Sequence, residues 1–405
     1  MSAVDTGFIL VASALVFLMT PGLAFFYGGL VGRQNTLTLM AQNLISLGVV
    51  SLLWALVGFS LAFGDSVGGI LGDLRYWLFR IEPRAVHPDL TIPSWTFFIF
   101  QGMFAVITPA LITGAFVDRF RFSSYLVFLS IWSLVVYSLL AHWVWGGGIL
   151  ADMSWLGLEQ GSIDFAGGTV VHISAGMAAL AAVRVLGNRK AQTPPHDIRF
   201  VILGAALLWF GWFGFNGGSA LAADETASLA FANTHLSASA AMVVWMFISW
   251  RHKGKPSIIG ALTGALAGLI AVTPAAGFVT PGWAVVIGAS AGAVCYGAVL
   301  FKEKRGWDDA LDVWAVHGVG GILGAILTGV FATPGGLAGA GGLIYGSGGL
   351  FVANLIATII SVIYAFVMTW VILKVLGTVM RLKPESDEIQ AGLDLTFHGE
   401  RAFDH

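Results

Sequence analysis

The chain has 405 residues, of which 57% are hydrophobic and only 10% are charged, whereas soluble domains carry roughly 25% charged residues. Long apolar runs recur from end to end, so we expect an all-α polytopic membrane protein. The net charge of −2 gives no reason to expect nucleic-acid binding, and the single cysteine, Cys295, excludes an intrachain disulfide and any cysteine-based metal cluster.

Hydropathy predicts eleven transmembrane helices. The first apolar run is long. Because no basic segment precedes it and no small-residue cleavage site follows it, we interpret it as the first span rather than as a signal peptide. The predicted spans lie near residues 7–31, 38–63, 95–117, 123–145, 168–186, 200–221, 227–250, 257–276, 281–301, 309–332 and 347–375.

An odd number of spans places the two termini on opposite sides of the bilayer. If the N-terminus lies outside, only Arg75, Arg80 and Arg84 of the 20 lysines and arginines face outward. Cytoplasmic connections carry an excess of positive residues. The sequence therefore predicts a multi-pass protein with its N-terminus outside and its C-terminus in the cytoplasm.

Eleven spans divide naturally into five, five and one. We predict an inverted 5+5 repeat, because an odd number of spans in each copy reverses the second copy. The predicted transmembrane domain covers residues 1–375, with repeat one at about 7–186, repeat two at about 200–332 and one long C-terminal helix at about 347–375. Residues 376–405 are predicted to form a cytoplasmic tail.

Two histidines occupy matching contexts in the two halves. His172 in span 5 and His317 in span 10 each follow an Asp by eight residues and precede a Gly by four, in otherwise apolar sequence. An ionisable side chain inside a membrane helix is costly, so it is a functional-site hypothesis. Two facing imidazoles can share one hydrogen bond and pass a small hydrogen-bonding solute or relay a proton.

The alternative for these histidines is a structural pair bonded to helix backbone. A zinc site usually needs three protein ligands, and a haem site needs axial ligands at suitable depth. No third intramembrane histidine or carboxylate joins this pair, so the sequence indicates no metal site and no cofactor.

Aromatic side chains accumulate in spans 3, 4 and 6. Phe104, Trp145 and Phe215, together with Ser219, are expected to build an outer vestibule with aromatic faces and one hydroxyl. Aromatic faces attract a small cation, more strongly when it is partly desolvated. For any single tryptophan among the 15, the alternative is the aromatic belt that membrane proteins carry at the bilayer interface.

Acidic residues stand at the starts of spans 5 and 10. We expect Asp164 to cap span 5 and to stabilise its helix dipole, and Asp308 and Asp309 to cap span 10 in the same way. Asp312 lies further inside, where an unpaired carboxylate is expensive, so we expect it to support the pore by bonding to backbone or to a neighbouring helix. Pro274 is expected to interrupt span 8.

Four motifs, in a fixed order, carry a family resemblance. They are Asp164-Phe-Ala-Gly-Gly-Thr-Val-Val-His172, Gly211-Trp-Phe-Gly-Phe-Asn-Gly-Gly-Ser219, Asp308-Asp-Ala-Leu-Asp-Val-Trp-Ala-Val-His-Gly318 and, in the tail, Gly392-Leu-Asp-Leu-Thr-Phe-His398-Gly-Glu400. With them the chain resembles the Amt/Rh family of ammonium transporters, on its bacterial and archaeal Amt side, over nearly its whole length.

The resemblance implies a homotrimer with one pore in each eleven-helix subunit, lying in the bacterial cytoplasmic (inner) membrane and serving nitrogen uptake. By motif match, Trp145, Ser219, Phe104 and Phe215 correspond to the external ammonium-binding site. Phe104 and Phe215 also correspond to a stacked phenyl gate.

The same resemblance assigns the inner part of the path. His172 and His317 match the paired pore histidines, and Asp164 matches an aspartate that is structural and needed for transport. Trp212 and Thr273 match further positions of the pore wall or vestibule. The tail resembles the cytoplasmic segment that helps to regulate transport and meets PII-type signalling proteins.

Two positions depart from the family pattern. Trp314 stands where phenylalanine is expected, three residues before His317, and Phe403 stands where the tail usually has tyrosine. The second departure removes a hydroxyl and bears on how the tail docks. Neither changes a pore histidine.

The expected function is ammonium transport into the cytoplasm. Ammonium resembles potassium in size and charge, but only ammonium donates hydrogen bonds and can lose a proton. We expect ammonium, or methylammonium as its analogue, to bind outside, lose its proton near the gate and cross as ammonia along His172 and His317, because a dry pore disfavours charge. Whether the proton follows, which would make transport electrogenic, stays open.

Two other classes of protein compete with a transporter. A sensor would signal through cytoplasmic partners, but the predicted tail of 30 residues is too short for an output domain. A membrane enzyme would use the histidines as acid and base, but no nucleophile or metal stands beside them, so we do not expect an enzyme.

Overall fold

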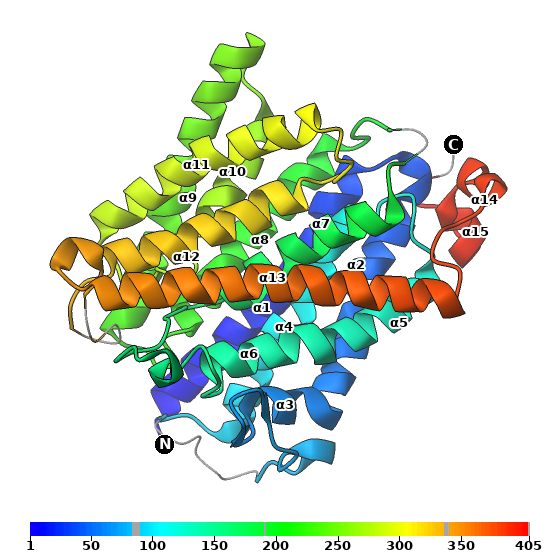
Figure 1. The fold of residues 1–405 in the computed structure, drawn as a ribbon. Coiled ribbons are helices and arrows are strands. Elements are labelled where there is room, and N and C mark those ends of the chain that lie inside the picture. The colour runs from blue at the N-terminus through cyan, green and yellow to red at the C-terminus, as the bar shows by residue number, and fades with distance from the viewer. Residues whose placement is uncertain (83–89, 190–191, 336–338, 340, 404–405) are drawn as a thin grey trace.

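The computed structural model describes residues 1–82, 90–189, 192–335, 339 and 341–403. Over these residues the chain is almost entirely helical, as Figure 1 shows. Strands β1 (Ser66–Val67) and β2 (Leu71–Gly72) form one short antiparallel hairpin. The predicted all-α architecture is confirmed.

The helices of the first half follow predicted spans 1 to 5. They are α1 (Ala3–Leu30); α2 (Thr36–Leu53), continuing through Trp54–Gly58 into α3 (Phe59–Phe63); α4 (Ser94–Ile112); α5 (Phe122–Trp132), continuing through Ser133–Tyr137 into α6 (Ser138–Trp145); and the turn Gly168–Ile173, continuing into α7 (Ser174–Leu186).

The helices of the second half follow spans 6 to 11, and two short helices form the tail. They are α8 (Ile198–Gly218), α9 (Glu225–Lys253), α10 (Ile258–Val272), α11 (Pro281–Lys304), the turn Trp314–Gly318 continuing into α12 (Val319–Phe331), α13 (Gly348–Val379), α14 (Ser386–Ala391) and α15 (Leu393–His398).

Span 8 is shorter than predicted. Ten helices of the described chain are long and apolar enough to cross a membrane, and α10, with 15 residues, falls short of that length. The helix ends at Val272, two residues before Pro274, which lacks the backbone N–H that would continue the hydrogen-bond pattern. Thr273, Ala275 and Ala276 are fully buried, and irregular backbone at membrane depth is tolerated where protein covers it.

The predicted start of span 10 at residue 309 is also wrong. Regular helical structure begins at Trp314. Asp312 has a φ of 59°, and this left-handed conformation cannot continue a right-handed helix. Asp308, Asp309 and Asp312 therefore lie in an irregular segment that precedes the helix in the chain.

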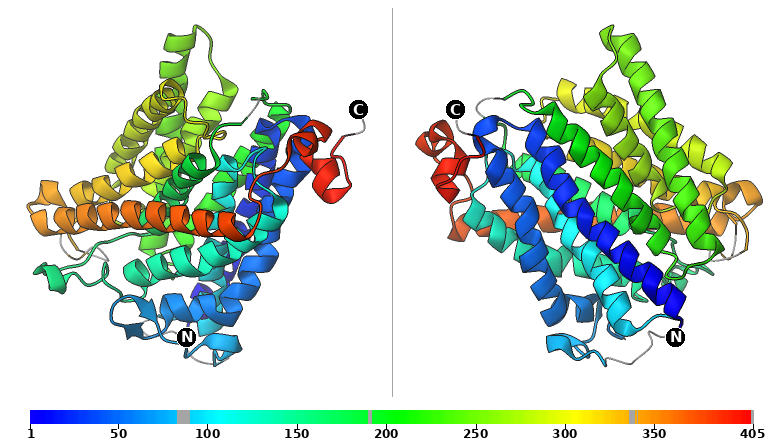
Figure 2. Two further views of the ribbon diagram at one scale, coloured as in Figure 1. Left: turned by 45° about the vertical axis from the view of Figure 1, so that its right-hand side comes forward. Right: turned by 180° about the vertical axis from the view of Figure 1, so that it is seen from behind.

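The two ends of the chain lie at opposite ends of the helix bundle (Figure 1). In both views of Figure 2 the tail helices α14 and α15 lie beside the C-terminal end of α1, far from the N-terminus. An odd number of crossings produces this arrangement.

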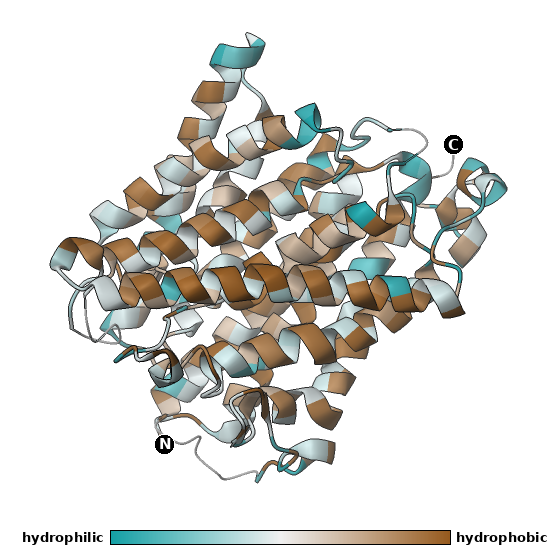
Figure 3. Ribbon diagram, viewed as in Figure 1, coloured by the Kyte–Doolittle hydropathy of each residue, from teal (hydrophilic) through white to brown (hydrophobic). Residues whose placement is uncertain are grey.

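Apolar side chains cover the outward faces of the long helices as well as the interior. Figure 3 shows hydrophobic residues along the whole length of α13 and teal residues mainly near helix ends and loops. Val375, Ile363 and Phe247 are each more than half exposed. A soluble protein rarely exposes so much contiguous apolar surface, so these faces meet lipid or another subunit.

Candidate functional site

The two histidines meet at the centre of the helix bundle. Nδ1 of His172 lies 3.2 Å from Nδ1 of His317, and the two rings are 1% and 7% exposed. Each histidine sits in a π-helical turn, Gly168–Ile173 for the first and Trp314–Gly318 for the second. Such wide turns inside α-helices are frequent at functional sites.

Glycines let the two histidine-bearing helices approach this closely. A Cβ on Gly176 would lie 2.1 Å from the backbone N of Gly318, and a Cβ on Gly321 would lie 2.9 Å from the carbonyl oxygen of Gly168. Real Cβ atoms do not come so near, so a side chain at either position would separate the helices. The glycine found four residues after each histidine thus has a packing role.

Buried aspartates hold the starts of both histidine segments. Asp164 accepts hydrogen bonds from the backbone N–H groups of Gly167, Gly168, Thr169 and Val170, at 2.7–3.3 Å. The expected capping of span 5 is therefore present. The carboxylate satisfies N–H groups that a helix start leaves without partners.

Asp309 plays the corresponding part in the second half, where its Oδ2 accepts from the N–H of Trp314 at 2.7 Å. Burial raises its pKa to about 6. The expectation that Asp308 also caps this span is wrong, because its carboxylate pairs with Arg119 and Arg189 instead. Burial opposes the charge of Asp308, but hydrogen bonds from Arg189 lower its pKa overall.

Three aromatic rings form a row that ends at the histidine pair, in the order Trp145, Phe104 and Phe215. Phe104 and Phe215 are buried, with ring centroids 4.2 Å apart and planes 36° from parallel. Trp145 is half-buried and meets Phe104 edge-on at 6.2 Å. Its indole N–H donates to the carbonyl of Asp164 at 2.8 Å, so the cap of span 5 also positions this ring.

Phe104 and Phe215 lie between the half-buried residues Trp145 and Ser219 on one side and the histidine pair on the other. Ser219 is half-buried, and its hydroxyl donates to the carbonyl of Phe215 at 2.8 Å, which leaves its oxygen free to accept. On its other side, Phe215 lies nearly parallel to the ring of His172, at 6.1 Å and 22°.

A narrow apolar cavity of about 20 Å³ runs past the two histidines, which is room for roughly one water-sized molecule. Trp212 forms part of its wall and stacks on His172 at 5.5 Å. The indole N–H of Trp212 donates to Thr273 at 2.9 Å, and this bond fixes the ring. The remaining lining comes from Met19, Leu23, Phe26, Tyr27, Ile107, Leu111, Val171, Leu208, Phe215 and Leu266.

Apart from Phe215, sequence reasoning did not single out these apolar lining residues. They come from several helices, and in a chain that is 57% hydrophobic no sequence signal separates a pore-lining leucine from a packed one. Only the folded arrangement identifies them.

Beyond His317 the path widens into a cavity of about 280 Å³. Asp312 and Arg189 line it together with His317. Asp312 forms an ion pair with Lys302 of α11, so the expected bond to a neighbouring helix is present. The path therefore changes from apolar to charged within a short distance of the second histidine.

A network of hydrogen bonds and ion pairs joins this wider cavity to the tail. Arg189 pairs with Asp308 at 2.8 Å and lies 3.7 Å from Asp118. Asn35 donates to Asp118 and accepts from the backbone N–H of Leu393 at 2.9 Å. Burial raises the pKa of Asp118, so its ionised form depends on these partners.

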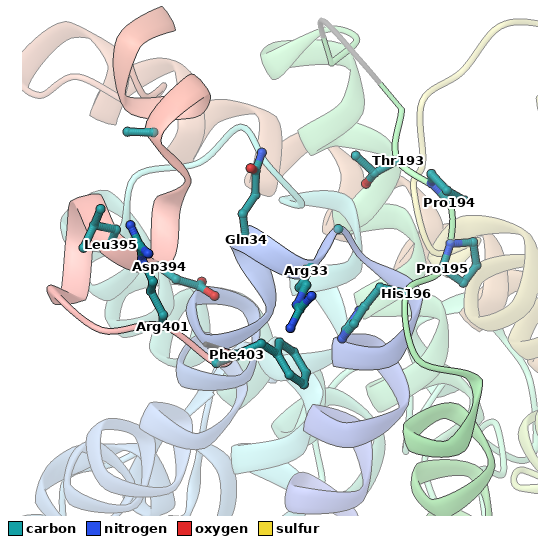
Figure 4. A pocket seen from close by; sticks show the side chains of 13 residues that line it. Arg33, Gln34, Thr193, Pro194, Pro195, His196, Asp394, Leu395, Arg401 and Phe403 are labelled. Atoms are coloured by element: carbon teal, nitrogen blue, oxygen red, sulfur yellow. The ribbon is translucent and has the colours of Figure 1, made fainter. Parts of the chain in front are cut away.

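The tail is docked on the loops beside α1 and α2. Both carboxylate oxygens of Asp394 accept backbone N–H groups at the start of α2, from Leu37 at 3.0 Å and Thr38 at 2.7 Å. The ring of Phe403 lies close to both Arg33, at 4.8 Å, and His196, at 5.1 Å (Figure 4). Phe403 thus packs through its ring.

No cluster of three or more His, Cys, Asp or Glu residues that could hold a metal ion occurs in the part of the chain that the structure describes. In the narrow cavity mainly hydrocarbon and aromatic side chains surround the histidine pair, and its ring nitrogens can donate and accept hydrogen bonds and exchange a proton.

Comparison with known proteins shows which molecules the chain is similar to. The model of the Ammonium Transporter Family matches residues 7–403. An ammonium transporter of Bacillus subtilis is 45% identical over 406 residues and is covered over 98% of both chains. Ammonium transporter Amt1 of Archaeoglobus fulgidus is 44% identical, with full coverage of both chains.

Solved structures show the same fold. Mep2 of Saccharomyces cerevisiae superposes with a TM-score of 0.87 at 34% identity, covering 96% of this chain and 90% of that one. A structure described as a sensor Amt protein superposes with a TM-score of 0.88 at 29% identity, covering 98% of each chain.

Proposed function

The chain belongs to the ammonium transporter family of membrane proteins, and we propose that it binds ammonium at its outer aromatic site, deprotonates it and conducts ammonia past His172 and His317. The observation that carries this proposal is the 3.2 Å contact of the two imidazoles beside a cavity with room for one small molecule.

The outer site is suited to a small cation that donates hydrogen bonds. Trp145, Phe104 and Phe215 offer aromatic faces or edges, and Ser219 offers an acceptor oxygen. A cation is attracted to aromatic faces and loses part of its hydration there. Methylammonium keeps the charge and N–H donors, so it is the natural labelled analogue.

The gate and the apolar cavity supply selectivity. The phenyl rings of Phe104 and Phe215 offer no charged group to an ion that passes them. Most side chains that line the cavity on the far side of these rings are hydrocarbon. Burying an unpaired charge costs far more than burying a neutral molecule. Ammonium escapes this cost by releasing a proton, whereas potassium cannot.

The histidine pair gives the neutral molecule hydrogen-bond partners inside the apolar cavity. If one Nδ1 donates to the other, the two Nε2 atoms take opposite roles, one as donor and one as acceptor. Nε2 of His172 is buried and has no hydrogen-bond partner among the described residues. Ammonia, which both donates and accepts, can satisfy it in passing.

We extend the proposal to topology and assembly. The charged network of Arg119, Arg189 and Asp308 lies at the tail end of the bundle, which supports a cytoplasmic C-terminus and an outer N-terminus. His235 on α9 is exposed beside Trp209. A polar ring facing lipid is costly, and a neighbouring subunit of a homotrimer would cover it.

The tail is proposed to regulate transport, alone or with a PII-type protein. Support comes from the path of contacts from Leu393 through Asn35, Asp118 and Arg189 to the wide cavity below His317. A change in tail docking would reach the exit through groups that are already joined by hydrogen bonds and one ion pair.

Current measurement on a solid-supported membrane tests the transport proposal directly. Proteoliposomes containing the purified chain receive pulses of ammonium and then of potassium. A current for ammonium alone supports selective transport with net charge movement. A change of internal pH without current supports neutral conduction of ammonia.

Silence in both assays, together with no uptake of labelled methylammonium, would contradict transport. That outcome would favour a sensing role. The fold is compatible with sensing as well, because a structure described as a sensor Amt protein has the same fold.

A further inference from the structure

The stretch at residues 162–165 leads into the histidine turn of span 5 and forms neither helix nor strand. Its backbone is held instead by bonds to other parts of the chain. The carbonyl of Asp164 accepts the indole N–H of Trp145 at 2.8 Å, and the N–H of Phe165 donates to the carbonyl of Pro274 at 3.1 Å. The position of this stretch therefore determines where the ring of Trp145 is held.

Asn354 of α13 binds the backbone of Ile163, the residue before Asp164, through both of its amide groups. Its Oδ1 accepts the N–H of Ile163 at 3.0 Å, and its Nδ2 donates to the carbonyl of Ile163 at 3.2 Å. Nδ2 also donates to the carbonyl of Ala325 in α12 at 3.0 Å. Because the side chain is 2% exposed and both N–H donors are used, these three bonds fix the amide in one orientation.

The surroundings of Asn354 on α13 are apolar. Leu350, Ala353 and Ala357, on the same face of this helix, are buried. A buried amide is costly unless it is hydrogen-bonded, and packing of α13 against α12 and α7 (Figure 1) does not require one. The amide does satisfy the N–H and carbonyl of Ile163, which no helix or strand pairs.

We propose that Asn354 is a positioning residue for the outer ammonium site, because it holds the backbone before Asp164 and, through the carbonyl of Asp164, the ring of Trp145. A cation–π contact weakens when the ring moves away from the cation. The inference rests on the proposed function. It gives the eleventh predicted span, which lies outside the predicted 5+5 repeat, a part in ammonium binding.

The concentration dependence of the ammonium-evoked current in N354L tests the proposal. Leucine is similar in size to asparagine but forms no hydrogen bond, so the buried backbone groups of Ile163 lose their partners. The stretch that holds Trp145 is then expected to move. We expect the half-saturating ammonium concentration to rise about two- to fivefold, as for loss of an exposed cation–π contact, while the maximal current is retained.

Two further variants separate positioning from stability. If Asn354 acts through Trp145, the double variant N354L/W145L should have the same half-saturating concentration as W145L, because the two effects are not additive. N43L is the control for a lost buried amide. Asn43 of α2 is fully buried and bonds to the carbonyl of Leu39 at 2.8 Å and to Thr113 at 3.4 Å, so N43L should melt lower but keep the half-saturating concentration of the parent.

An unchanged half-saturating concentration in N354L, or additive increases in N354L/W145L, would overturn the proposal. If N354L does not fold, N354D carries the same test, because it keeps the acceptor for the N–H of Ile163 and loses both donors. Failure of N354D to fold would show that these bonds serve the fold, and would overturn the proposal as well. Absence of ammonium current in the parent is a different result, which would contradict the proposed function itself.

Discussion

The Nδ1 atoms of His172 and His317 lie 3.2 Å apart, although 145 residues separate them in the chain. At this distance one imidazole donates and the other accepts, so the tautomer of each ring determines that of the other. The pair is enclosed by Trp212, Phe215 and hydrocarbon side chains. Each ring can therefore exchange a proton with its partner or with a molecule in this cavity, and His317 also with a molecule in the wider cavity that it lines.

Removal of both rings tests their role. In H172A/H317A we expect the ammonium-evoked current to fall at least tenfold, because the cavity loses both imidazole rings. Size-exclusion chromatography of the purified variant controls for folding. Full, ammonium-selective current in this variant would eliminate the proton relay.

Trp145 is predicted to set the affinity of the outer site. In W145L we expect the half-saturating ammonium concentration to rise about two- to fivefold, because an exposed cation–π contact contributes about 0.5–1 kcal/mol. W155L removes another tryptophan, one that is exposed, and should leave the value unchanged. Equal affinity in W145L and the parent would remove Trp145 from the binding site.

Gly176 is predicted to be intolerant of any side chain. In G176A the new methyl group would meet the backbone of Gly318, so the two histidine-bearing helices must separate. We expect a loss of stability of more than about 2 kcal/mol, as for other overpacked core positions, and a lower melting temperature in detergent.

Gly297 provides the matched control. A Cβ there meets nothing within 4 Å, and alanine is favoured over glycine in a helix by about 1 kcal/mol. G297A should therefore melt at the same temperature as the parent or slightly above. A melting temperature for G176A equal to that of G297A would show that the close approach is not required.

Asp164 is predicted to be essential for folding rather than for binding. D164A leaves four buried N–H groups without an acceptor, at about 1–3 kcal/mol for each unsatisfied group. We expect little folded protein. D164N keeps one acceptor oxygen and should lie between D164A and the parent in melting temperature.

A control for this prediction is D224A. Asp224 is exposed and caps α9 through a single bond to the N–H of Ala227, at 2.9 Å. Loss of an N-cap costs about 1 kcal/mol, so D224A should accumulate normally. If D164A accumulated and melted like D224A, the buried cap would not be needed.

Asn35 is predicted to couple the tail to the exit. N35A removes the bonds to Asp118 and to the backbone of Leu393 together, so hydrogen exchange at residues 386–403 should accelerate and the ammonium current should fall. N188A is the control, since exposed Asn188 bonds only to the carbonyl of Gly306 among the described residues. Faster hydrogen exchange of the tail without any change in the ammonium current would contradict a role of tail docking in regulating transport.

Several features could be predicted from the amino-acid sequence because they depend on local chemistry. Long apolar runs predicted the helices, and the Asp–His–Gly spacing pointed to His172 and His317 before their contact was visible. The errors have local physical causes: Pro274 ends α10 early, and the left-handed conformation of Asp312 delays the start of span 10. The inverted repeat and the roles of the site residues stay predictions.

By itself the sequence determined that this chain crosses a membrane many times, with a rare ionisable group in each half, because hydrophobicity and charge act residue by residue. The tertiary structure alone decided which groups meet. Glycines at Gly176 and Gly318 allow the backbones to touch, and this contact sets the distance between the histidines. The apolar pore wall and the pairing of Asp308 with arginines also depend on segments distant in the chain, and one sequence carries no local signal for either.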